Sequence, residues 1–246
     1  MTSSKESQPT VSIVIPAFNE AARIGDSIRK IDEFVRQSPI SFELIVVDDG
    51  SSDDTVAIIN QFPMKELRLI RNHQNQGKGY TVRDGVLAAT GKYVLFTDAD
   101  LSAPIGEMTK LLDVARNEDA DVVIGSRAVD RSYIEKHQTH FREFGGIVFN
   151  RMVRVLLGLN LHDTQCGFKL FNREKSKPIF EKQTTNGFGF DPELLFLARR
   201  HGLRIRETSV RWSHAEGSKV KFLRDGPRMF LDLVRIRWNA LTGRYS

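Results

Sequence analysis

The sequence contains very little cysteine and no long apolar run. Its 246 residues include one cysteine, Cys166, so an intramolecular disulfide framework and a zinc site built from several thiolates are both excluded. No uninterrupted apolar run approaches the roughly 18 residues that span a bilayer. Residues 1–10 lack the apolar core of a secretory signal, and the six histidines show no metal-binding spacing. We therefore expect a protein of a reducing compartment that is soluble or peripheral to a membrane.

Charge is distributed unevenly along the chain. Residues 1–125 carry 13 basic and 19 acidic side chains, a net charge of −6, whereas residues 126–246 carry 23 and 12, a net charge of +11. With 27% charged and 40% hydrophobic residues the chain can form a buried core, which excludes a disordered or low-complexity protein. A pI near 9.4 is compatible with nucleic acid or anionic lipid as a partner and does not choose between them.

Apolar, β-branched runs alternate with helical patterns through the first half of the chain. The expected strands are 11–15, which Pro16 would end, 42–47, 67–71, 93–97 and 122–125. The expected helices are 24–35, 54–61, 78–89 and 104–117. This alternation predicts an α/β fold with a mostly parallel sheet, helices on both faces and a ligand site at the carboxyl ends of the strands.

The second half of the chain lacks this regular alternation of strand and helix patterns. A polar stretch at 128–142 has few apolar anchors and is typical of a loop or lid. After it we expect a helix at 145–157, a strand at 168–171, a helix at 192–201, a strand at 203–207 and a last helix that begins at Pro227. No internal repeat or linker is evident.

Polar clusters follow three of the expected strands, at 16–20, 48–51 and 98–100. Taken singly, each has the residues of a turn or a helix cap. Together they would place several carboxylates at one sheet edge, where they repel unless a cation or a donor-rich ligand joins them. Asp98 and Asp100 are two residues apart, which in extended backbone puts both carboxylates on one side of the chain. Their oxygens suit Mg2+ or Mn2+ bound to a diphosphate, and such a cation would offset the charge on a leaving nucleoside diphosphate.

Lys78 lies between two glycines at the expected start of a helix, but the segment is not a P-loop. The Walker pattern requires glycine at 72 and serine or threonine at 79, where this chain has Asn72 and Gly79. Lys78 could meet a phosphate at the helix N-terminus or be a solvated lysine in a glycine turn. A nucleophilic Cys166 would need a partner base that the sequence cannot place, so a buried structural thiol is favoured.

Arginines and an amphipathic pattern mark the second half. The arginines near the expected lid suit a phosphate held at two points, and equally a solvated helical face. They are Arg127, Arg131, Arg142, Arg151 and Arg154. Near the end of the chain a polar stripe of Arg228, Asp232, Arg235 and Asn239 lies opposite an apolar stripe of Met229, Phe230, Leu233, Val234 and Trp238. This helix could pack on the core or lie on an anionic membrane with Trp238 at the interface.

These motifs together resemble the family 2 glycosyltransferases of the GT-A fold. The first half carries the general signature at 16–20 (PAFNE), 46–53 (VVDDGSSD), 75–79 (NQGKG) and 98–100 (DAD). The second half resembles the dolichyl-phosphate β-glucosyltransferase branch at 125–127 (GSR), 163–171 (DTQCGFKLF), 189–191 (GFD) and 216–219 (EGSK). The resemblance runs from about residue 11 to residue 245.

The resemblance implies an inverting transfer of one hexose, glucose above others, from a nucleotide sugar such as UDP-glucose to a polyprenyl or dolichyl phosphate. The implied cofactor is Mg2+ or Mn2+. On the donor side it implies Pro16, Phe18 and Glu20 in the nucleoside pocket, Asp48 or Asp49 on the base, Lys78 near the donor, and Asp98 and Asp100 on ribose, metal and diphosphate. On the acceptor side it implies Arg127 and Arg142 on the acceptor phosphate, with Gln165 and Asp191 near the sugar.

The sequence departs from the family pattern in places. The mannosyltransferase relatives have a glutamine two residues past the metal-binding pair, where this chain has Ser102, so its third protein ligand is in question. The eukaryotic glucosyltransferases begin with a membrane helix that is absent from this sequence, which indicates a prokaryotic enzyme. Thr208 and Val234 stand where processive members of the wider family have Gln or Arg, so we expect one sugar per acceptor.

The expected organisation follows from the resemblance and the charge pattern. We expect a disordered N-terminus at 1–10 and one domain at 11–246, with a nucleotide-sugar half at 11–125, an acceptor half at 126–224 and a basic amphipathic helix at 225–246. The protein would be cytoplasmic and peripheral, with an anionic membrane surface as a partner. Its oligomeric state does not follow from the sequence.

Other functions are compatible with parts of the pattern. A phosphate acceptor is ionised at neutral pH and needs no general base, so Asp191 would act as a base only on a hydroxyl acceptor. The same fold could use a mannose or N-acetylglucosamine donor, or a saccharide hydroxyl as acceptor. A nucleotide- or nucleic-acid-binding module is a more distant alternative. Nucleic acid is not expected, because no such motif is present and the aromatic residues are not interleaved with basic ones.

Overall fold

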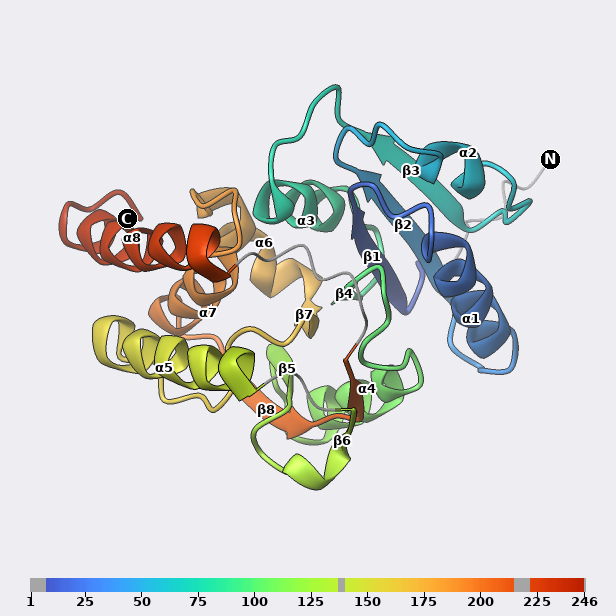
Figure 1. Cartoon of the computed structure of the whole chain (residues 1–246). Helices are drawn as coiled ribbons and strands as arrows, with labels where there is room; N and C mark the ends of the chain where they lie inside the picture. Colours follow the sequence, from blue (N-terminus) through green and yellow to red (C-terminus); the bar gives the residue numbers. More distant parts are fainter. Residues whose placement is uncertain (1–7, 137–139, 215–221, 246) are drawn as a thin grey trace.

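The computed structural model describes residues 8–136, 140–214 and 222–245, and a seven-stranded sheet forms its centre (Figure 1). The strand order is β3-β2-β1-β4-β7-β5-β8. The strands are β1 (Val11–Ala17), β2 (Phe42–Asp48), β3 (Leu67–Arg71), β4 (Tyr93–Thr97), β5 (Val122–Ser126), β7 (Phe168–Asn172) and β8 (Ile205–Ser209). All neighbouring pairs are parallel except those made by β7, which runs antiparallel to both β4 and β5. The predicted α/β fold with a mostly parallel sheet is confirmed.

Helices cover both faces of the sheet and create two cores. One core packs α1 (Ile24–Arg36), α2 (Thr55–Ile59) and α4 (Glu107–Asn117) on one face. The other packs α3 (Lys78–Ala88), α5 (His140–Leu157), α6 (Arg173–Lys182), α7 (Phe190–Arg200) and α8 (Phe222–Leu241) on the opposite face. The alternation of side chains along each strand divides the buried residues between these cores: Ile13 and Ile15 of β1 lie in the first, and Val14 lies in the second.

Strand β1 extends through Pro16, which we expected to end it. Pro16 pairs with Val47 of β2 and Ala17 with Asp48, whereas pairing with β4 stops at Val14. A proline lacks the N–H that a sheet ladder needs, but here it occupies a stretch where one side of the strand is already unpaired. The strand therefore carries the first polar cluster to the same sheet edge as Asp48.

The expected lid at 128–142 contains short regular elements. A 3-10 turn at Arg131–Tyr133 leads into β6 (Ile134–Lys136), which pairs with β9 (Trp212–Ser213) in a separate two-stranded sheet. Helix α5 begins at His140, earlier than the expected 145, and residues 137–139 lie outside the described part. The partner of β6 is distant in sequence, so the local pattern could not reveal this strand.

Other boundaries shift for local reasons. Helix α8 begins at Phe222, so Pro227 lies inside it instead of at its start. Helix α6 was not expected, since its sequence is polar and contains Pro178. Helix α7 begins two residues before 192, and β8 lies at 205–209 instead of 203–207. These differences leave the fold class unchanged.

The described part of the N-terminal segment is held against the body of the molecule. The Gln8 side chain donates to Thr90 O at 2.9 Å, Pro9 O accepts from Lys92 N at 2.9 Å, and Thr10 N donates to Ser41 O at 2.9 Å. Residues 8–10 therefore differ from the disordered N-terminus that we expected, and residues 1–7 lie outside the described part.

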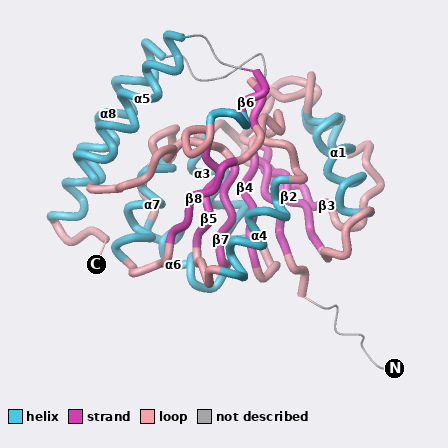
Figure 2. Tube along the Cα trace, turned by 90° about the horizontal axis from the view of Figure 1, so that it is seen from below, coloured by secondary structure: helices cyan, strands magenta, loops and turns pink. Residues whose placement is uncertain are grey.

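Helices α5 and α8 lie side by side along one flank of the molecule (Figures 1 and 2). Helix α1 lies at the opposite flank (Figure 2). Among the helices as far as the structure describes them, none is long and apolar enough to cross a bilayer.

Candidate active site

The carboxyl ends of β1, β2 and β4 lie side by side, so the three polar clusters meet at one edge of the sheet. The turn after β1 and the turn after β2 are bonded to each other: Asn19 N donates to Ser51 Oγ at 2.8 Å, and Ser52 N donates to Asn19 Oδ1 at 2.8 Å. Asn19 has a φ of 52°, a left-handed conformation that asparagine tolerates better than most residues. The sequence placed these clusters together correctly.

The two aspartates after β2 have different surroundings, although both are buried. Asp49 accepts from Asn72 Nδ2 at 2.9 Å, from Gln76 N at 2.9 Å and from Gly77 N at 2.8 Å, which shapes the loop before α3. The Asp48 carboxylate accepts, among its described contacts, only from Ser51 N, at 3.3 and 3.4 Å to its two oxygens. Asp49 therefore already has its hydrogen bonds, and Asp48 is the more available of the two for a ligand.

Glu20 connects the first cluster to the third through Arg23. The Glu20 carboxylate is ion-paired with the Arg23 guanidinium, and its backbone N donates to Thr55 Oγ1 at 2.7 Å. Arg23 Nη1 lies 3.8 Å from Asp100 Oδ2. Phe18, at 37% exposure, is the most open side chain of the 16–20 segment that we assigned to a nucleoside pocket. Pro16 lies beneath it, half-buried in β1.

Asp98 and Asp100 lie in the turn after β4, not in extended backbone as their spacing suggested. Strand β4 ends at Thr97, and Leu101 N donates back to Asp98 O at 3.1 Å. Lys78 Nζ is 2.6 Å from Asp98 Oδ1, and Asp100 Oδ1 accepts from Ser102 N at 2.9 Å. The side chains of Asp98 and Asp100 are 32% and 21% exposed, so both carboxylates can reach a bound ligand.

Lys78 is the cation that faces this turn from α3. Burial lowers the pKa of Lys78, but the carboxylates of Asp98 and Asp191 outweigh burial and raise its pKa above the ordinary value. Lys78 Nζ also lies 5.4 Å from the centre of the Phe96 ring. Lys78 is therefore a charged side chain held in the site, which excludes the alternative of a solvated lysine in a turn.

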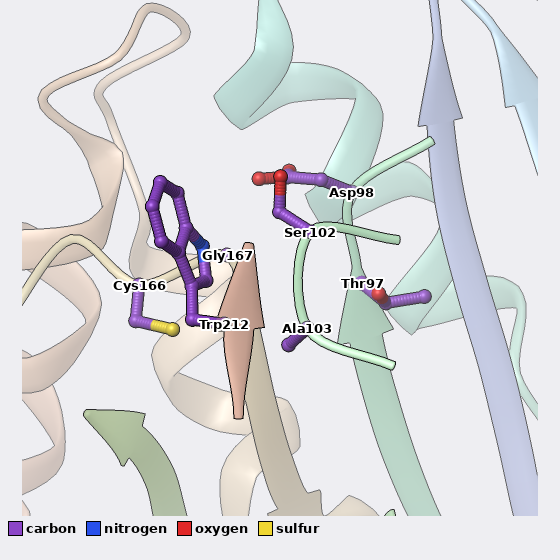
Figure 3. Close-up of a pocket in the computed structure, with 7 residues that line it drawn as sticks. All are labelled: Thr97, Asp98, Ser102, Ala103, Cys166, Gly167 and Trp212. Atoms are coloured by element: carbon purple, nitrogen blue, oxygen red, sulfur yellow. The ribbon is translucent and has the colours of Figure 1, made fainter. Parts of the chain in front are cut away.

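A pocket opens beside Asp98, and Trp212 forms the wall across from it (Figure 3). Its lining residues come from β4, from the turn after it, from the segment before β7 and from β9: Thr97, Asp98, Ser102, Ala103, Cys166, Gly167 and Trp212. A Cβ atom at Gly167 would come within 2.0 Å of Asp98 Oδ2, so a side chain there would displace the Asp98 carboxylate. Cys166 is 1% exposed and burial raises the pKa of its thiol to about 12, as expected for a structural thiol.

Arg127 forms a bidentate ion pair with Asp163 at the end of β5. Nε and Nη2 of Arg127 donate to Asp163 Oδ2 and Oδ1 at 2.7 and 2.8 Å. Burial would raise the pKa of Asp163, but Arg127 outweighs it and lowers this pKa to about 2. The guanidinium lies 5.4 Å from the Trp212 ring centre. One edge of Arg127 is thus already taken, so a two-point grip on a phosphate would need its other edge.

The remaining arginines do not gather around the pocket. Arg131 pairs with Glu143 at 2.8 Å, Arg154 donates to Asn160 Oδ1 at 2.6 Å, and Arg151 is exposed on α5. The side chain of Arg142 and the 216–219 segment lie outside the described residues. Gln165 is half-buried next to the pocket residue Cys166, and its backbone N donates to Asp163 Oδ1 at 3.1 Å.

Asp191 is held by a buried lysine. Lys169 Nζ lies 2.5 Å from Asp191 Oδ1 and donates to Cys166 O at 2.6 Å, and the Lys169 side chain is 0% exposed. Burial raises the pKa of Asp191, and the attraction of Lys169 and Lys78 offsets only part of this shift. Asp191 is 4% exposed, so it lies beneath the site and is not open to an acceptor.

Asp98 and Trp212 therefore line a pocket at the end of the sheet, with Lys78 paired to Asp98 and Arg127 lying against the Trp212 ring. In the part of the chain that the structure describes, no group of three or more His, Cys, Asp or Glu side chains could hold a metal ion by itself. The family model described as glycosyl transferase family 2 matches residues 12–180. The chain belongs to glycosyl transferase family 2.

The relatives and a solved structure extend this assignment. The chain is 34% identical over 247 residues to a dolichyl-phosphate beta-glucosyltransferase of Dictyostelium discoideum, covering 95% of this chain and 75% of the relative. It is 36% identical over 255 residues to the dolichyl-phosphate beta-glucosyltransferase of Saccharomyces cerevisiae, covering 96% and 76%. Glucosyl-3-phosphoglycerate synthase from Mycobacterium tuberculosis, in complex with Mn2+, UDP-glucose and glycerol 3-phosphate, has a TM-score of 0.67 at 23% identity and covers 96% of this chain and 80% of that chain. The protein is a glycosyltransferase, and the similarity to the solved structure shows the shared GT-A fold.

Sequence reasoning did not single out three residues in or next to the candidate site. Lys169 carries a signal that could have found it, since a charged residue inside an apolar strand must have a buried partner. Gly167 and Trp212 carry no such signal, because their roles depend on β7 and β9 approaching Asp98 and Arg127 in space.

Proposed function

We propose that this glycosyltransferase transfers one glucose from UDP-glucose to a polyprenyl or dolichyl phosphate, with inversion at the anomeric carbon. The observation that carries the proposal is the pairing of Lys78 with Asp98, close to Asp100 in sequence, at a pocket that Trp212 lines and against which Arg127 packs through that tryptophan ring. This arrangement offers oxygen ligands and a cation for a diphosphate on one side, and an arginine for a second phosphate on the other. The names of its relatives support glucose and dolichyl phosphate as substrates.

Asp98 and Asp100 would hold Mg2+ or Mn2+. Both are partly exposed carboxylates, and hard oxygen donors of this kind suit either cation. With no third carboxylate or histidine grouped with them among the described residues, diphosphate oxygens would supply further ligands. When bound, the cation offsets the charge on the leaving diphosphate. Lys78 would add a second positive charge there, and its 2.6 Å contact with Asp98 Oδ1 keeps it in reach.

The nucleoside would lie along the ends of β1 and β2. Phe18 is exposed enough to cover a base, and Glu20 is fixed by Arg23 close to Asp100. Asp48 would contact the base in preference to Asp49, whose oxygens already hold the loop before α3. Pro16 would shape the floor of this pocket.

The acceptor phosphate would approach from the side of Arg127, with Arg142 as a second contact. A phosphate oxygen forms the new bond to the anomeric carbon, the bond from that carbon to the UDP oxygen breaks, and UDP leaves with the electron pair. No general base is required, because the acceptor phosphate is already ionised. The buried Lys169–Asp191 pair fits this scheme, since Asp191 would fix the charge balance under Lys78 instead of removing a proton. Gln165 would lie near the sugar.

The organisation that we propose places the nucleotide sugar in residues 11–125 and the acceptor in 126–224, within one domain. The helix at 225–246 would bring the enzyme to an anionic membrane surface as a peripheral protein on the cytoplasmic face. Nucleic acid is not a partner in this scheme.

The test is UDP release in the presence of Mn2+, UDP-glucose and a polyprenyl phosphate, compared with the same mixture without the lipid. We expect lipid-dependent release, which Asp98→Asn and Asp100→Asn reduce by about a hundredfold or more because the diphosphate loses its cation. Asp113→Asn, a change of charge on α4 away from the site, is the matched control. Normal turnover in an Asp98→Asn, Asp100→Asn double variant would contradict the assignment of these two residues to the site. UDP release that does not depend on the lipid with any common nucleotide sugar would reject polyprenyl phosphate as the acceptor.

A further inference from the structure

Helices α5 and α8 expose a shared apolar surface that the catalytic site does not use. Both helices contact each other and α7, and their buried sides join the same core. On α5 the buried side is formed by Phe149, Val153 and Leu157, and on α8 by Met229, Leu233, Ile236 and Ala240. Because α7 lies beneath both helices, their opposite sides face away from the body of the molecule.

The outward sides are apolar instead of polar. On α5 the exposed large apolar residues are Phe144, Ile147, Val148 and Val155, and on α8 they are Phe230, Leu231, Val234, Trp238 and Leu241. Val155 is 76% exposed, Leu241 70%, and Trp238 and Phe144 65% each. We call the exposed sides of these two helices the α5–α8 face. Of the apolar stripe predicted on α8, Met229 and Leu233 are therefore in the core, whereas Phe230, Val234 and Trp238 are on the surface.

Helical spacing aligns most of each set along one face of its helix. On α5, Phe144, Val148 and Val155 lie on one helical face, which Arg151 interrupts. On α8, Leu231, Val234, Trp238 and Leu241 follow one another at steps of three or four residues. An exposed stripe of this length on each of two adjacent helices is unusual for a water-exposed surface and marks an interaction site.

The charges around the stripes select the kind of partner. The charged side chains that are exposed on the described parts of α5 and α8 are all arginines: Arg151, Arg154, Arg224, Arg228, Arg235 and Arg237. The acidic side chains there are covered or half-covered, since Asp225 is 4% exposed and Asp232 packs against Gly189. Arginines bordering an apolar stripe with an interfacial tryptophan are the pattern of a helix that lies in the headgroup region of an anionic bilayer.

We propose that the α5–α8 face is one membrane-docking surface, formed by both helices together, that seats the enzyme on an anionic lipid bilayer. The proposal rests on the proposed function in requiring a membrane-borne acceptor, and it adds α5 to the helix at 225–246. It also connects the bilayer to the site, because Asp232 of α8 lies against Gly189, two residues from Asp191. A membrane-bound α8 would thus lie next to the start of α7, which carries Asp191.

The experiment measures binding of the full chain to vesicles of phosphatidylcholine alone or mixed with phosphatidylglycerol, with neither donor nor polyprenyl phosphate present. We expect about tenfold tighter binding to the anionic vesicles. Ile147→Ser with Val155→Ser on α5, and Leu231→Ser with Trp238→Ser on α8, should each weaken binding by about tenfold. Arg228→Gln with Arg235→Gln should remove most of the preference for anionic lipid. Leu87→Ser on α3 and Arg116→Gln on α4 are exposed controls that should bind like the wild type.

Fluorescence gives an independent readout. The chain has two tryptophans, and Trp212 is 8% exposed, so a blue shift on adding anionic vesicles reports Trp238 entering the interface. Wild-type protein that ignores anionic vesicles, or α5 variants that bind as tightly as the wild type, would overturn the two-helix surface. So would a dimer in solution that the α5 and α8 variants dissociate while vesicle binding is unchanged.

Turnover on a short, water-soluble polyprenyl phosphate separates this proposal from the proposed function. Variants that retain this turnover are folded, so a loss of vesicle binding in them reports the surface alone. Vesicle binding without any glucose transfer would support the membrane-docking surface and reject the proposed acceptor. Glucose transfer without vesicle binding would support the acceptor and reject the docking surface.

Discussion

At the scale of single residues, Gly167 shows how closely the backbone approaches a reactive carboxylate. Its N-terminal neighbour Cys166 lines the same pocket, and Gly167 O accepts from Asp98 N at 3.2 Å. The space that a Cβ would need is filled by the Asp98 side chain. The position of the Asp98 side chain therefore depends on the absence of a side chain at Gly167, the residue just before β7.

We expect Gly167→Ala to lower kcat by about a hundredfold, because a carboxylate displaced by about 1 Å no longer meets its ligand correctly. The fold should persist, as checked by circular dichroism and thermal melting. Gly187→Ala is the matched control, since a Cβ there has open space and its φ is not left-handed. Equal turnover in the two variants would mean that Asp98 can shift without consequence.

Because of the Arg127–Asp163 pair, we expect the free energy of unfolding to decrease at low pH. Asp163 has a folded pKa of about 2, below its ordinary value of 3.8, so its contribution is present above pH 3.8 and is lost as the pH falls toward 2. The free energy of unfolding should lose about 2 kcal/mol from this pair over that range. Urea unfolding of wild type and Asp163→Asn at pH 6 and pH 3 should detect about half of this loss, because pH 3 lies between the two pKa values. A gap between the two proteins that stays constant with pH would contradict this assignment.

At the scale of elements, β7 supplies the buried lysine that lies beneath the candidate site. It enters the sheet antiparallel between β4 and β5, and Lys169 at its centre faces the α7 side, where it meets Asp191. Lys169 Nζ is also 5.7 Å from the Phe96 ring centre, on the same ring that Lys78 approaches. One strand thus supplies the cation that balances a buried carboxylate under the donor site.

Removing one member of this pair should cost far more than removing both. Lys169→Met leaves the buried Asp191 carboxylate without its hydrogen-bonded partner, and we expect a loss of about 3–5 kcal/mol in the free energy of unfolding. Lys169→Met combined with Asp191→Leu should recover most of that loss, because well-packed apolar residues replace a buried ion pair at little cost. Urea denaturation of the three proteins gives the comparison. A double variant as unstable as the single one would show that the pair is not coupled.

At the scale of the whole molecule, the acidic and basic halves of the sequence are not two separate bodies. Strand β7 belongs to the basic half, yet it lies between β4 and β5 of the acidic half. The sheet therefore crosses the boundary near Gly125 at which we divided the chain. On the outside of α5 and α8 the exposed charged side chains of the described residues are all arginines.

This distribution predicts a salt dependence that differs between binding and folding. Raising NaCl from about 0.05 M to about 0.5 M should weaken association with anionic vesicles several-fold, because the screening length falls well below 10 Å. Arg228→Gln with Arg235→Gln should flatten that dependence. The thermal midpoint should change little, since the Arg127–Asp163 and Lys169–Asp191 pairs are buried and poorly screened. A flat salt response in wild-type vesicle binding would contradict an electrostatic contribution.

The sequence alone determined the first half of the fold and the position of its polar clusters at the strand ends. Period-two and helical patterns depend on neighbours within a few residues, so 11–125 was divided correctly into strands and helices, and the clusters around Asp48 and Asp98 fell at strand ends. The motifs were sufficient to indicate the family, which the match over 12–180 confirmed.

Tertiary structure alone decided which groups face each other. The insertion of β7, the β6–β9 pair and the shared α5–α8 face join segments that are far apart in the chain, and no local pattern encodes such contacts. Asp191 illustrates the difference: the sequence indicated a residue near the sugar, but only its burial against Lys169 showed a charge-balanced group that is closed to the acceptor. Local periodicity sets what each segment becomes, whereas burial and charge pairing depend on what the rest of the chain places beside it.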